Sequence, residues 1–239
     1  MFHRVLFYAS IFNLLSSLHA GSELDNLAQK YYADKSSNWH NYAVIYEKYL
    51  EPLKNSPIKF LEIGLAMGYS AHMWREYFPA ADLHFIENQQ HFIDIYMSTN
   101  PRRSHCYLLD QSDEFDLLKF IEESGGNFDV ILDDGGHQMD QQITSFRILF
   151  PAVKSGGIYI IEDLATSFTA MGEYSTESKP GTTVHFLKQL IDEINAFTIK
   201  PAGLPYFCSD YRKYSDLTYY QQNIESIHCH NGTVIIVKR

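Results

Sequence analysis

Two short acidic segments contain the residues best suited to chemistry. Residues 133–137 read Asp-Asp-Gly-Gly-His, and residues 162–163 read Glu-Asp; each segment directly follows an apolar run. If the two runs are neighbouring strands about 4.8 Å apart, Asp134 and the pair Glu162 and Asp163 converge. Carboxylates packed together do not all stay ionised unless a cation neutralises them. Because oxygen ligands suit Mg²⁺, we expect these three acids to bind a magnesium ion.

His137 stands three residues after Asp134. A hydroxyl group is a weak nucleophile at neutral pH, but coordination to a metal lowers its pKa and an imidazole can then accept its proton. The alternatives are that His137 caps a helix or hydrogen-bonds a nearby acid. The preceding acids and glycines favour a role as the general base.

The elements that position these residues follow from the alternation of apolar runs with amphipathic segments. Parallel βαβ units are typical of this pattern, and runs without internal alternation indicate strands buried on both faces. We therefore expect an α/β, Rossmann-like, doubly wound sheet. The expected strands are 58–65, 82–88, 106–112, 128–134 and 156–163, with helices at 70–78, 91–99, 113–124 and 139–153. Asn231-Gly232 predicts a hairpin of two closing strands, which makes the sheet mostly parallel and seven-stranded.

Ligands of such sheets bind beyond the carboxyl ends of the strands. All five expected parallel strands carry an acid at this end. Five acids at one edge of the sheet indicate a binding site rather than ordinary solvent-exposed residues. The acids are Glu62, Glu87, Asp110, Asp133 with Asp134, and Glu162 with Asp163. The first strand continues into a turn with Gly64 and Gly68, and this turn departs from the dinucleotide fingerprint G-x-G-x-x-G. Ser70 is a plausible N-cap for the next helix.

The composition of the chain argues against several classes of partner and site. The 239 residues include 19 Lys and Arg against 29 Asp and Glu, a net charge of −10 without a basic stripe, so a nucleic-acid partner is not expected. Cys106, Cys208 and Cys229 are far apart and predict neither a zinc site nor a disulfide framework. Residues 1–20 suggest either a signal peptide of an exported protein or an amphipathic helix of a cytoplasmic one. No apolar run has the roughly 20 residues of a membrane span.

Several segments together resemble class I S-adenosylmethionine-dependent methyltransferases. They are "KFLEIGLAMGYSAHMWREYFPAADLHFIE", "LLDQSD", "FDVILDDGGH" and "GGIYIIEDL". The D-D-G-x-H and I-E-D motifs are more similar to a narrower group, the macrocin and mycinamicin sugar O-methyltransferases, as is the lead-in "ADKSSNWHNYAVIYEKYL". The resemblance covers about residues 27–200. Ala66 departs from it, since many class I enzymes carry glycine there.

The resemblance implies a role for each matching position. The methionine end of S-adenosylmethionine would contact Glu62, Gly64 and Gly68, with Ser70 at the same turn. Its ribose hydroxyls would contact Glu87, and its adenine would contact Asp110 with Gln111 or Ser112. Asp133 would lie near the sulfonium. Asp134, Glu162 and Asp163 match the magnesium ligands, and His137 matches the proposed base.

The resemblance also implies one methyltransferase domain over 21–239. Its parts would be a helical lead-in at 21–55, a cofactor-binding core at 56–165, and a substrate-side segment with closing strands at 166–239. Segments 168–183 and 205–220 are either a lid and a stacking wall for a sugar or a surface loop and an oligomer contact.

The expected activity is methyl transfer from S-adenosylmethionine to a hydroxyl of a saccharide or glycosylated small molecule, assisted by magnesium. The alternatives are a nicotinamide-dependent oxidoreductase and a non-catalytic nucleoside-binding protein of the same fold. The methyl acceptor and the oligomeric state, including a homo-oligomer, stay open.

Overall fold

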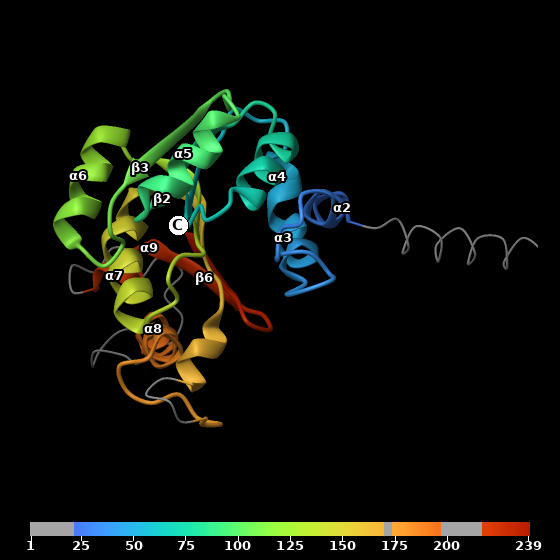
Figure 1. Ribbon diagram of the computed structural model, residues 1–239. Coiled ribbons are helices and arrows are strands. Elements are labelled where there is room, and N and C mark those ends of the chain that lie inside the picture. Colours follow the sequence, from blue (N-terminus) through green and yellow to red (C-terminus); the bar gives the residue numbers. More distant parts are fainter. Residues whose placement is uncertain (1–21, 170–173, 197–216) are drawn as a thin grey trace, which may run out of the picture. The chain divides into compact units, whose positions relative to one another are not determined.

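The computed structural model describes residues 22–169, 174–196 and 217–239 (Figure 1). The expected targeting segment and most of the aromatic stretch 205–220 lie outside these residues. The chain divides into two compact units, which we describe separately. One unit comprises residues up to Asn55 together with Tyr69–Pro79, and the other comprises Ser56–Gly68 and Ala80–Arg239. Within the described ranges, no helix combines the length and the apolar character that crossing a bilayer requires.

The described part of the first unit is helical. Its elements are α2 (Glu23–Lys30), α3 (Tyr42–Leu50), the 3₁₀ helix η1 (Glu51–Leu53) and α4 (Tyr69–Tyr77). Ser22 caps α2 by accepting a hydrogen bond from the backbone N–H of Asp25. Lys30 forms an ion pair with Glu76 at 2.6 Å, which links α2 to α4.

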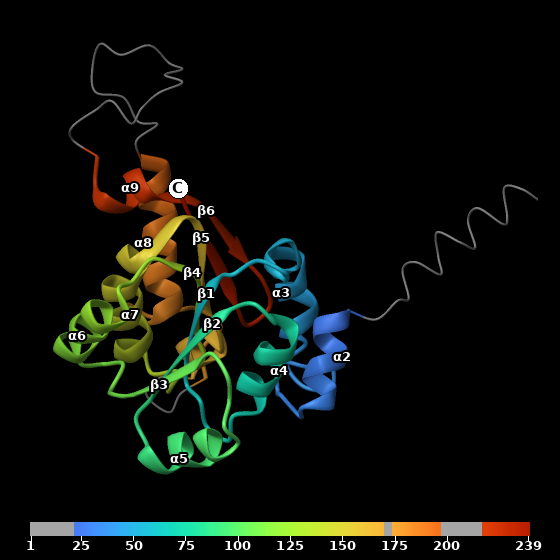
Figure 2. The same ribbon diagram turned by 90° about the horizontal axis from the view of Figure 1, so that it is seen from above.

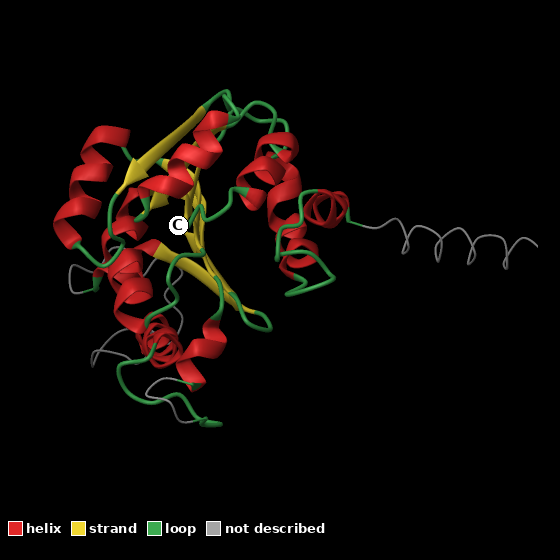
Figure 3. Ribbon diagram, in the orientation of Figure 1, coloured by secondary structure: helices red, strands yellow, loops and turns green. Residues whose placement is uncertain are grey.

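The second unit contains a seven-stranded sheet in the order β3-β2-β1-β4-β5-β7-β6. Figure 3 shows its strands in yellow. Its strands are β1 (Lys59–Ile63), β2 (Asp82–Glu87), β3 (Ser104–Leu108), β4 (Phe128–Asp133), β5 (Val153–Ile161), β6 (Ile224–Cys229) and β7 (Val234–Lys238). The first five strands pair in parallel and the last two form an antiparallel hairpin. Every residue of β4 is buried, as expected for a central strand. The predicted Rossmann-like fold, with its hairpin at Asn231-Gly232, is confirmed.

The helices of this unit follow the parallel strands. They are α5 (Gln90–Ser98), α6 (Glu114–Ser124), α7 (Met139–Leu149), η2 (Phe150–Ala152), η3 (Leu164–Phe168), α8 (Thr183–Ala196) and α9 (Tyr219–Asn223). Helices α6, α7 and α8 lie on the same side of the sheet (Figure 2). The core between α7 and the sheet is aromatic: the rings of Phe146 and Tyr159 meet edge to face at 5.2 Å between centroids, and the ring of Phe146 stacks on Phe150 at 4.9 Å.

The strand order reverses between β1 and β4. From β1 the chain moves outward to β2 and β3 and then returns to the opposite side of β1 as β4. The backbone N–H of Asp134 still bonds the carbonyl of Ile63 at 3.0 Å, so the two strands stay joined to their carboxyl ends. Beyond that point the connections diverge, and open sheets bind their ligands in the crevice this creates.

Candidate active site

A cavity of about 250 Å³ lies at this reversal point. The turn after β1, the end of β2, the loop after β3 and the loop after β4 all contribute to its wall. Lining residues include Gly64, Glu87, Phe92, Gln111, Asp134 and Gly135. Four of these six, namely Gly64, Glu87, Gln111 and Asp134, were predicted as site residues.

The carboxylate of Glu87 organises the turn after β1. One of its oxygens accepts hydrogen bonds from the backbone N–H groups of Leu65 and Ala66, at 3.1 and 2.9 Å. The other oxygen accepts from Asn88 and Gln89, at 2.9 and 3.0 Å. Hydrogen bonds to an ionised acceptor are among the stronger ones in proteins. Glu87 therefore holds two cavity walls together while its own side chain faces the cavity.

The glycines of this turn are required by their surroundings. Gly64 has φ +92°, and a Cβ there would overlap the carbonyl oxygen of Asp134 and lie 2.9 Å from its carbonyl carbon. A Cβ on Gly68, at φ +76°, would lie 2.9 Å from the ring of Tyr96. Ala66 also has a positive φ, +43°, a conformation that favours glycine and strains alanine. The sequence departure at Ala66 therefore falls at a position where glycine would be the relaxed choice.

Gln111 ties the loops after β3 and β4 together. It is almost completely buried, and its Nε2 donates to Asp133 Oδ1 and to Ser145 Oγ, both at 3.0 Å. Its Oε1 accepts from the backbone N–H of Gly136 at 2.8 Å. A Cβ on Gly135 would overlap that same Oε1. The side chain of Gln111 therefore explains why Gly135, the first of the two glycines after the acid pair, has no room for a side chain.

The second glycine makes room for another amide. A Cβ on Gly136 would overlap Oε1 of Gln141 and lie 2.7 Å from its Nε2. Gln141 Oε1 in turn accepts from the backbone N–H of Gln138, the residue that caps α7. His137 therefore does not cap this helix, and that alternative for His137 is wrong.

The two adjacent aspartates have different environments. Asp133 is fully buried at the end of β4. Burial raises the pKa of its carboxyl to about 7, although the hydrogen bonds from Gln111 and from the N–H of Gly135 oppose the shift, and the neighbouring Asp134 adds to it. Asp134 lines the cavity, with 16% of its side chain exposed. The repulsion between the pair is reduced because one carboxyl enters the protein and the other faces the cleft.

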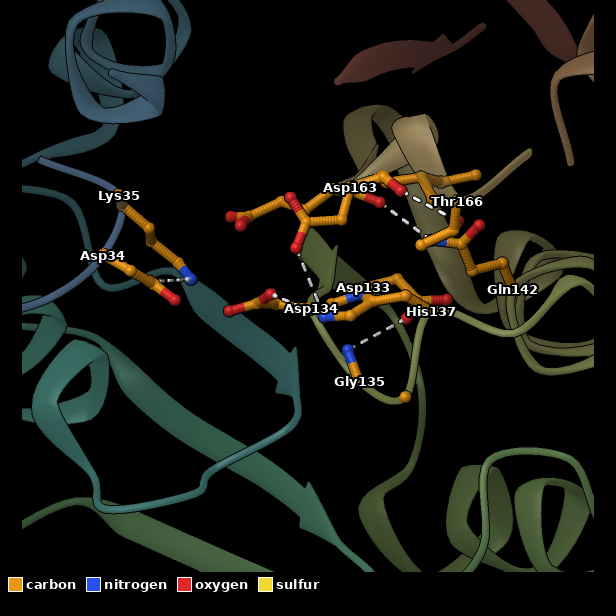
Figure 4. Close-up of polar contacts among 12 residues, drawn as sticks. Asp34, Lys35, Asp133, Asp134, Gly135, His137, Gln142, Asp163 and Thr166 are labelled. Atoms are coloured by element: carbon orange, nitrogen blue, oxygen red, sulfur yellow. Dashed lines mark hydrogen bonds and ion pairs between the residues drawn. The ribbon is translucent and has the colours of Figure 1, made fainter. Parts of the chain in front are cut away.

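Asp134, His137 and Asp163 form an acid–histidine cluster. His137 Nε2 lies 3.4 Å from Asp163 Oδ2 and 3.9 Å from Asp134 Oδ1. Figure 4 shows the three side chains pointing toward one another. The backbones of His137 and Asp163 both adopt left-handed conformations, with φ of 56° and 54°. Such conformations are unfavourable for these residues, and in proteins they concentrate at functional sites.

The backbone beside Asp163 is held by its neighbours. Thr166 donates to the Asp163 carbonyl from both its N–H and its Oγ1, at 3.2 and 2.9 Å. Gln142, fully buried in α7, donates from Nε2 to the carbonyl of Glu162 at 2.8 Å. Asp163 makes no side-chain capping bond to η3. Its carboxylate is therefore directed to the cluster.

The donor set of this cluster fits a divalent cation. One ligand atom from each of Asp134, His137 and Asp163 lies within 4.8 Å of the other two. Two carboxylates and open access suit Mg²⁺, which keeps several water ligands. Glu162, the third predicted acid ligand, is fully buried directly after β5 and does not belong to this group among the described residues. Its role as a ligand stays a prediction.

Comparison with known proteins supports one family. No protein-family model matches the chain. It is 34% identical over 184 residues to the 8-demethyl-8-(2-methoxy-alpha-L-rhamnosyl)-tetracenomycin-C 3'-O-methyltransferase of Streptomyces olivaceus, a match that spans 72% of this chain and 45% of that protein. It is 30% identical over 184 residues to the mycinamicin VI 2''-O-methyltransferase of Micromonospora griseorubida, across 72% of this chain and 44% of the relative.

A solved structure supports the same family as these sequence relatives. The MycE methyltransferase from the mycinamycin biosynthetic pathway, in complex with Mg and SAH, superposes with a TM-score of 0.76 at 26% identity, over 90% of this chain and 54% of that one. The chain belongs to the class I S-adenosylmethionine-dependent methyltransferase fold family. Within that fold family its relatives are sugar O-methyltransferases, and the chain spans about half the length of the curated relatives it matches.

The structure of this methyltransferase homologue separates the predicted cofactor residues into three groups. Gly64, Glu87 and Gln111 line the cavity. Glu62 and Asp133 are fully buried beneath it. Asp110 Oδ1 accepts from the N–H and Oγ of Ser112, both at 2.8 Å, and this exposed turn supports the loop that contains Gln111.

Two further predicted residues lie at the turn after β1. Gly68 closes the turn against Tyr96. Ser70 is the second residue of α4, which begins at Tyr69, so the prediction that Ser70 caps this helix is wrong; it belongs to the other unit. The cofactor contacts of all the predicted residues stay predictions.

Sequence reasoning missed several lining residues, including Asn88, Gln89, Phe92 and Leu109. Most of them follow the ends of β2 and β3 directly, so their position just past a buried strand was the available signal. Phe92 lies one turn further, in α5, and nothing in its local sequence distinguishes it from a core aromatic.

Proposed function

We propose that this chain is an S-adenosylmethionine-dependent O-methyltransferase that methylates a hydroxyl of a saccharide or glycosylated small molecule, with magnesium assistance. One observation carries the proposal. Asp134 lines the cavity and also belongs to the acid–histidine cluster, so a methyl donor in the cavity and a base for the acceptor would be neighbours. The acceptor class is supported by the names of the relatives, which specify a rhamnosyl-tetracenomycin, an olivosyl-oleandolide and mycinamicin VI as substrates.

The donor side rests on the cavity residues. Glu87 is placed to accept hydrogen bonds from ribose hydroxyls, because its carboxylate faces the cavity and its backbone partners fix its orientation. Gly64 lines the cavity, and its missing Cβ leaves room for the carbonyl of Asp134, which keeps the turn after β1 and the acid segment close together. When bound, S-adenosylmethionine supplies an activated methyl group on a positively charged sulfonium.

The acceptor side rests on the cluster. Asp134 and Asp163 would hold the magnesium ion with His137 beside them, and Glu162 is the further acid that the sequence predicts. When bound, the ion lowers the pKa of a coordinated hydroxyl. His137 Nε2 accepts the hydroxyl proton, and the charge it gains lies between two carboxylates.

The reaction is a single displacement. The acceptor oxygen forms a bond to the methyl carbon as the carbon–sulfur bond breaks, and the electron pair of that bond stays on sulfur, which becomes a neutral thioether. The hydroxyl proton moves to His137. The protein contributes alignment and electrostatics rather than a covalent intermediate.

Transfer of labelled methyl from S-adenosylmethionine into a panel of rhamnosides and other glycosides tests the proposal. We expect label in an ether at a sugar hydroxyl and loss of transfer when a chelator removes the metal. Binding of S-adenosylhomocysteine without transfer to any glycoside would favour a non-catalytic binding protein. Binding of NAD in its place would favour an oxidoreductase.

A further inference from the structure

A second cluster of metal-binding side chains lies at the opposite ends of β2 and β3 from the cavity. Asp82 is the first residue of β2, and His84 follows two residues later on the same face of the strand. His105 in β3 is the direct register partner of His84. The Asp82 carboxylate lies between the two imidazoles: Oδ2 is 3.1 Å from His84 Nε2, and Oδ1 is 2.9 Å from His105 Nε2.

These separations match a shared metal ion. With ligand bonds of about 2.0–2.2 Å, donor atoms around one ion lie about 3 Å apart at right angles and about 3.4 Å apart in a tetrahedron. One ligand atom from each of the three residues already lies within 4.8 Å of the other two. The three residues are therefore close enough to be candidate ligands of one ion.

His84 is oriented as a metal ligand. Its Nδ1 lies 3.1 Å from the hydroxyl of Tyr107, so Nε2 is left directed at Asp82. Metal-binding histidines usually use their second ring nitrogen in a hydrogen bond of this kind, which sets the ring orientation. The rings of Phe128 and His105 pack on the His84 imidazole at 5.3 and 4.8 Å between centroids.

The protonation states also suit a metal. Burial lowers the pKa of His84, which keeps the imidazole neutral, as a ligand must be. Partial burial of Asp82 opposes ionisation, but the hydrogen bonds with His84 and His105 outweigh it and lower the pKa of this carboxyl. A bound ion would take the place of the Nε2 protons in these hydrogen bonds. Lys59 is the nearby cation that also lowers the pKa of His84, and its ammonium donates to the carbonyls of Ser124 and Gly126.

An ion can reach the cluster from solvent. The side chains of Asp82 and His105 are 50% and 52% exposed, whereas that of His84 is 5% exposed. This arrangement resembles an open zinc site, with three protein ligands and a remaining position for water. Two imidazoles and one carboxylate favour Zn²⁺, Ni²⁺ or Cu²⁺ over Mg²⁺.

We propose that Asp82, His84 and His105 bind a divalent transition-metal ion, Zn²⁺ being the representative, and that this ion pins the edge strand β3 to β2. In the part of the chain that the structure describes, β3 pairs with β2 alone. The far ends of the two strands lead to Glu87 and to the loop with Gln111, both in the cavity wall. The ion would thus stabilise the part of the sheet that supports the cavity without contacting it.

Zn²⁺ titration in competition with a chromophoric chelator tests the proposal. The background is His137→Gln, because the acid–histidine cluster could also take up zinc. In that background we expect one zinc site. Adding His105→Asn should weaken it by at least about 100-fold, since loss of an outer hydrogen-bond partner alone weakens metal sites about 10–100-fold. Tyr107→Phe should show that smaller loss, and His91→Asn, which removes an exposed imidazole on α5, should show none.

Two further readouts locate the ion. The ring nitrogens of His84 and His105 should shift in ¹⁵N NMR spectra on addition of Zn²⁺, and those of His91 should not. Zinc at about 100 times its Kd should raise Tm by about 5–10 °C, and His105→Asn should remove that rise. Equal zinc affinity with and without His105→Asn, or zinc uptake that leaves the His84 ring signals in place, would overturn the proposal.

Discussion

Substitution of Gly135 by alanine should disrupt the connection between the acid segment and the loop after β3. The backbone of Gly135 is not in the left-handed region, so alanine itself is compatible with the local conformation. The added Cβ, however, would overlap Gln111 Oε1 and lie 2.7 Å from its Cδ. Gln111 would have to move, which breaks its hydrogen bonds to Asp133, Ser145 and Gly136.

The magnitude follows from these contacts. Overpacking of a filled site costs about 1–3 kcal/mol, and each buried hydrogen bond that is lost adds about 1 kcal/mol. Alanine restricts the unfolded chain, which returns about 0.4–1 kcal/mol. We expect Gly135→Ala to lower the free energy of unfolding by about 3–5.5 kcal/mol, measured by urea denaturation, and to weaken binding of S-adenosylhomocysteine in the same cavity.

A double-mutant cycle identifies the cause. In a Gln111→Ala background the obstructing amide is gone, so the added methyl group should change stability by less than about 1 kcal/mol. Gln111→Ala by itself should be destabilising because the buried Asp133 loses a donor. An equal effect of Gly135→Ala in both backgrounds would refute the reasoning, because the penalty would then come from something other than Gln111.

Two other substitutions separate the roles of the site residues. Glu87→Gln should weaken S-adenosylhomocysteine binding by about 1.5–3 kcal/mol, roughly 10–100-fold by calorimetry, because an amide cannot accept from all four backbone N–H groups. Glu122→Gln, on the exposed face of α6, is the matched control and should leave the affinity unchanged. His137→Ala should lower turnover by about 10²–10⁴-fold while S-adenosylhomocysteine still binds, whereas Asp134→Asn should reproduce the effect of a chelator. If turnover is unchanged in His137→Ala, the base must be another group.

The sequence predicted the sheet because each strand is a short apolar run bounded by turn residues. β4 illustrates this, since all six of its positions are buried. Boundaries were less accurate: β3 was expected at 106–112 but spans Ser104–Leu108, so Asp110 lies in the following turn. Register is decided by pairing with β2, which the local sequence does not contain.

Convergence of the acid segments was predictable, because β4 and β5 are neighbours and both end in acids. The structure brings Asp134 and Asp163 together around His137. Which acid of the second pair faces the cleft was not predictable, since it depends on the burial of Glu162. Gln111 illustrates the same limit: the sequence suggested a contact with adenine, but the three hydrogen bonds of this side chain depend on residues up to 34 positions away.

The His84 and His105 pair shows a further limit of sequence patterns. The two histidines are 21 positions apart, at no spacing typical of a metal motif, and they meet only because β2 and β3 pair in that register. Asp82, which bridges them, looked like an ordinary residue at the start of a strand. A single sequence does not reveal such side-by-side placement before the register of the edge strand is known.

Calorimetric titration of S-adenosylhomocysteine into the intact chain, with NAD titrated in parallel, tests the central claim most directly. The cavity where β1 and β4 diverge should bind one equivalent of the methyl-donor product and no NAD, and the affinity should persist after a chelator removes divalent metal, because Glu87 and the glycine turn hold the nucleoside side without it. Absence of binding, or binding of NAD in its place, would contradict the assignment of this cavity to a methyl donor.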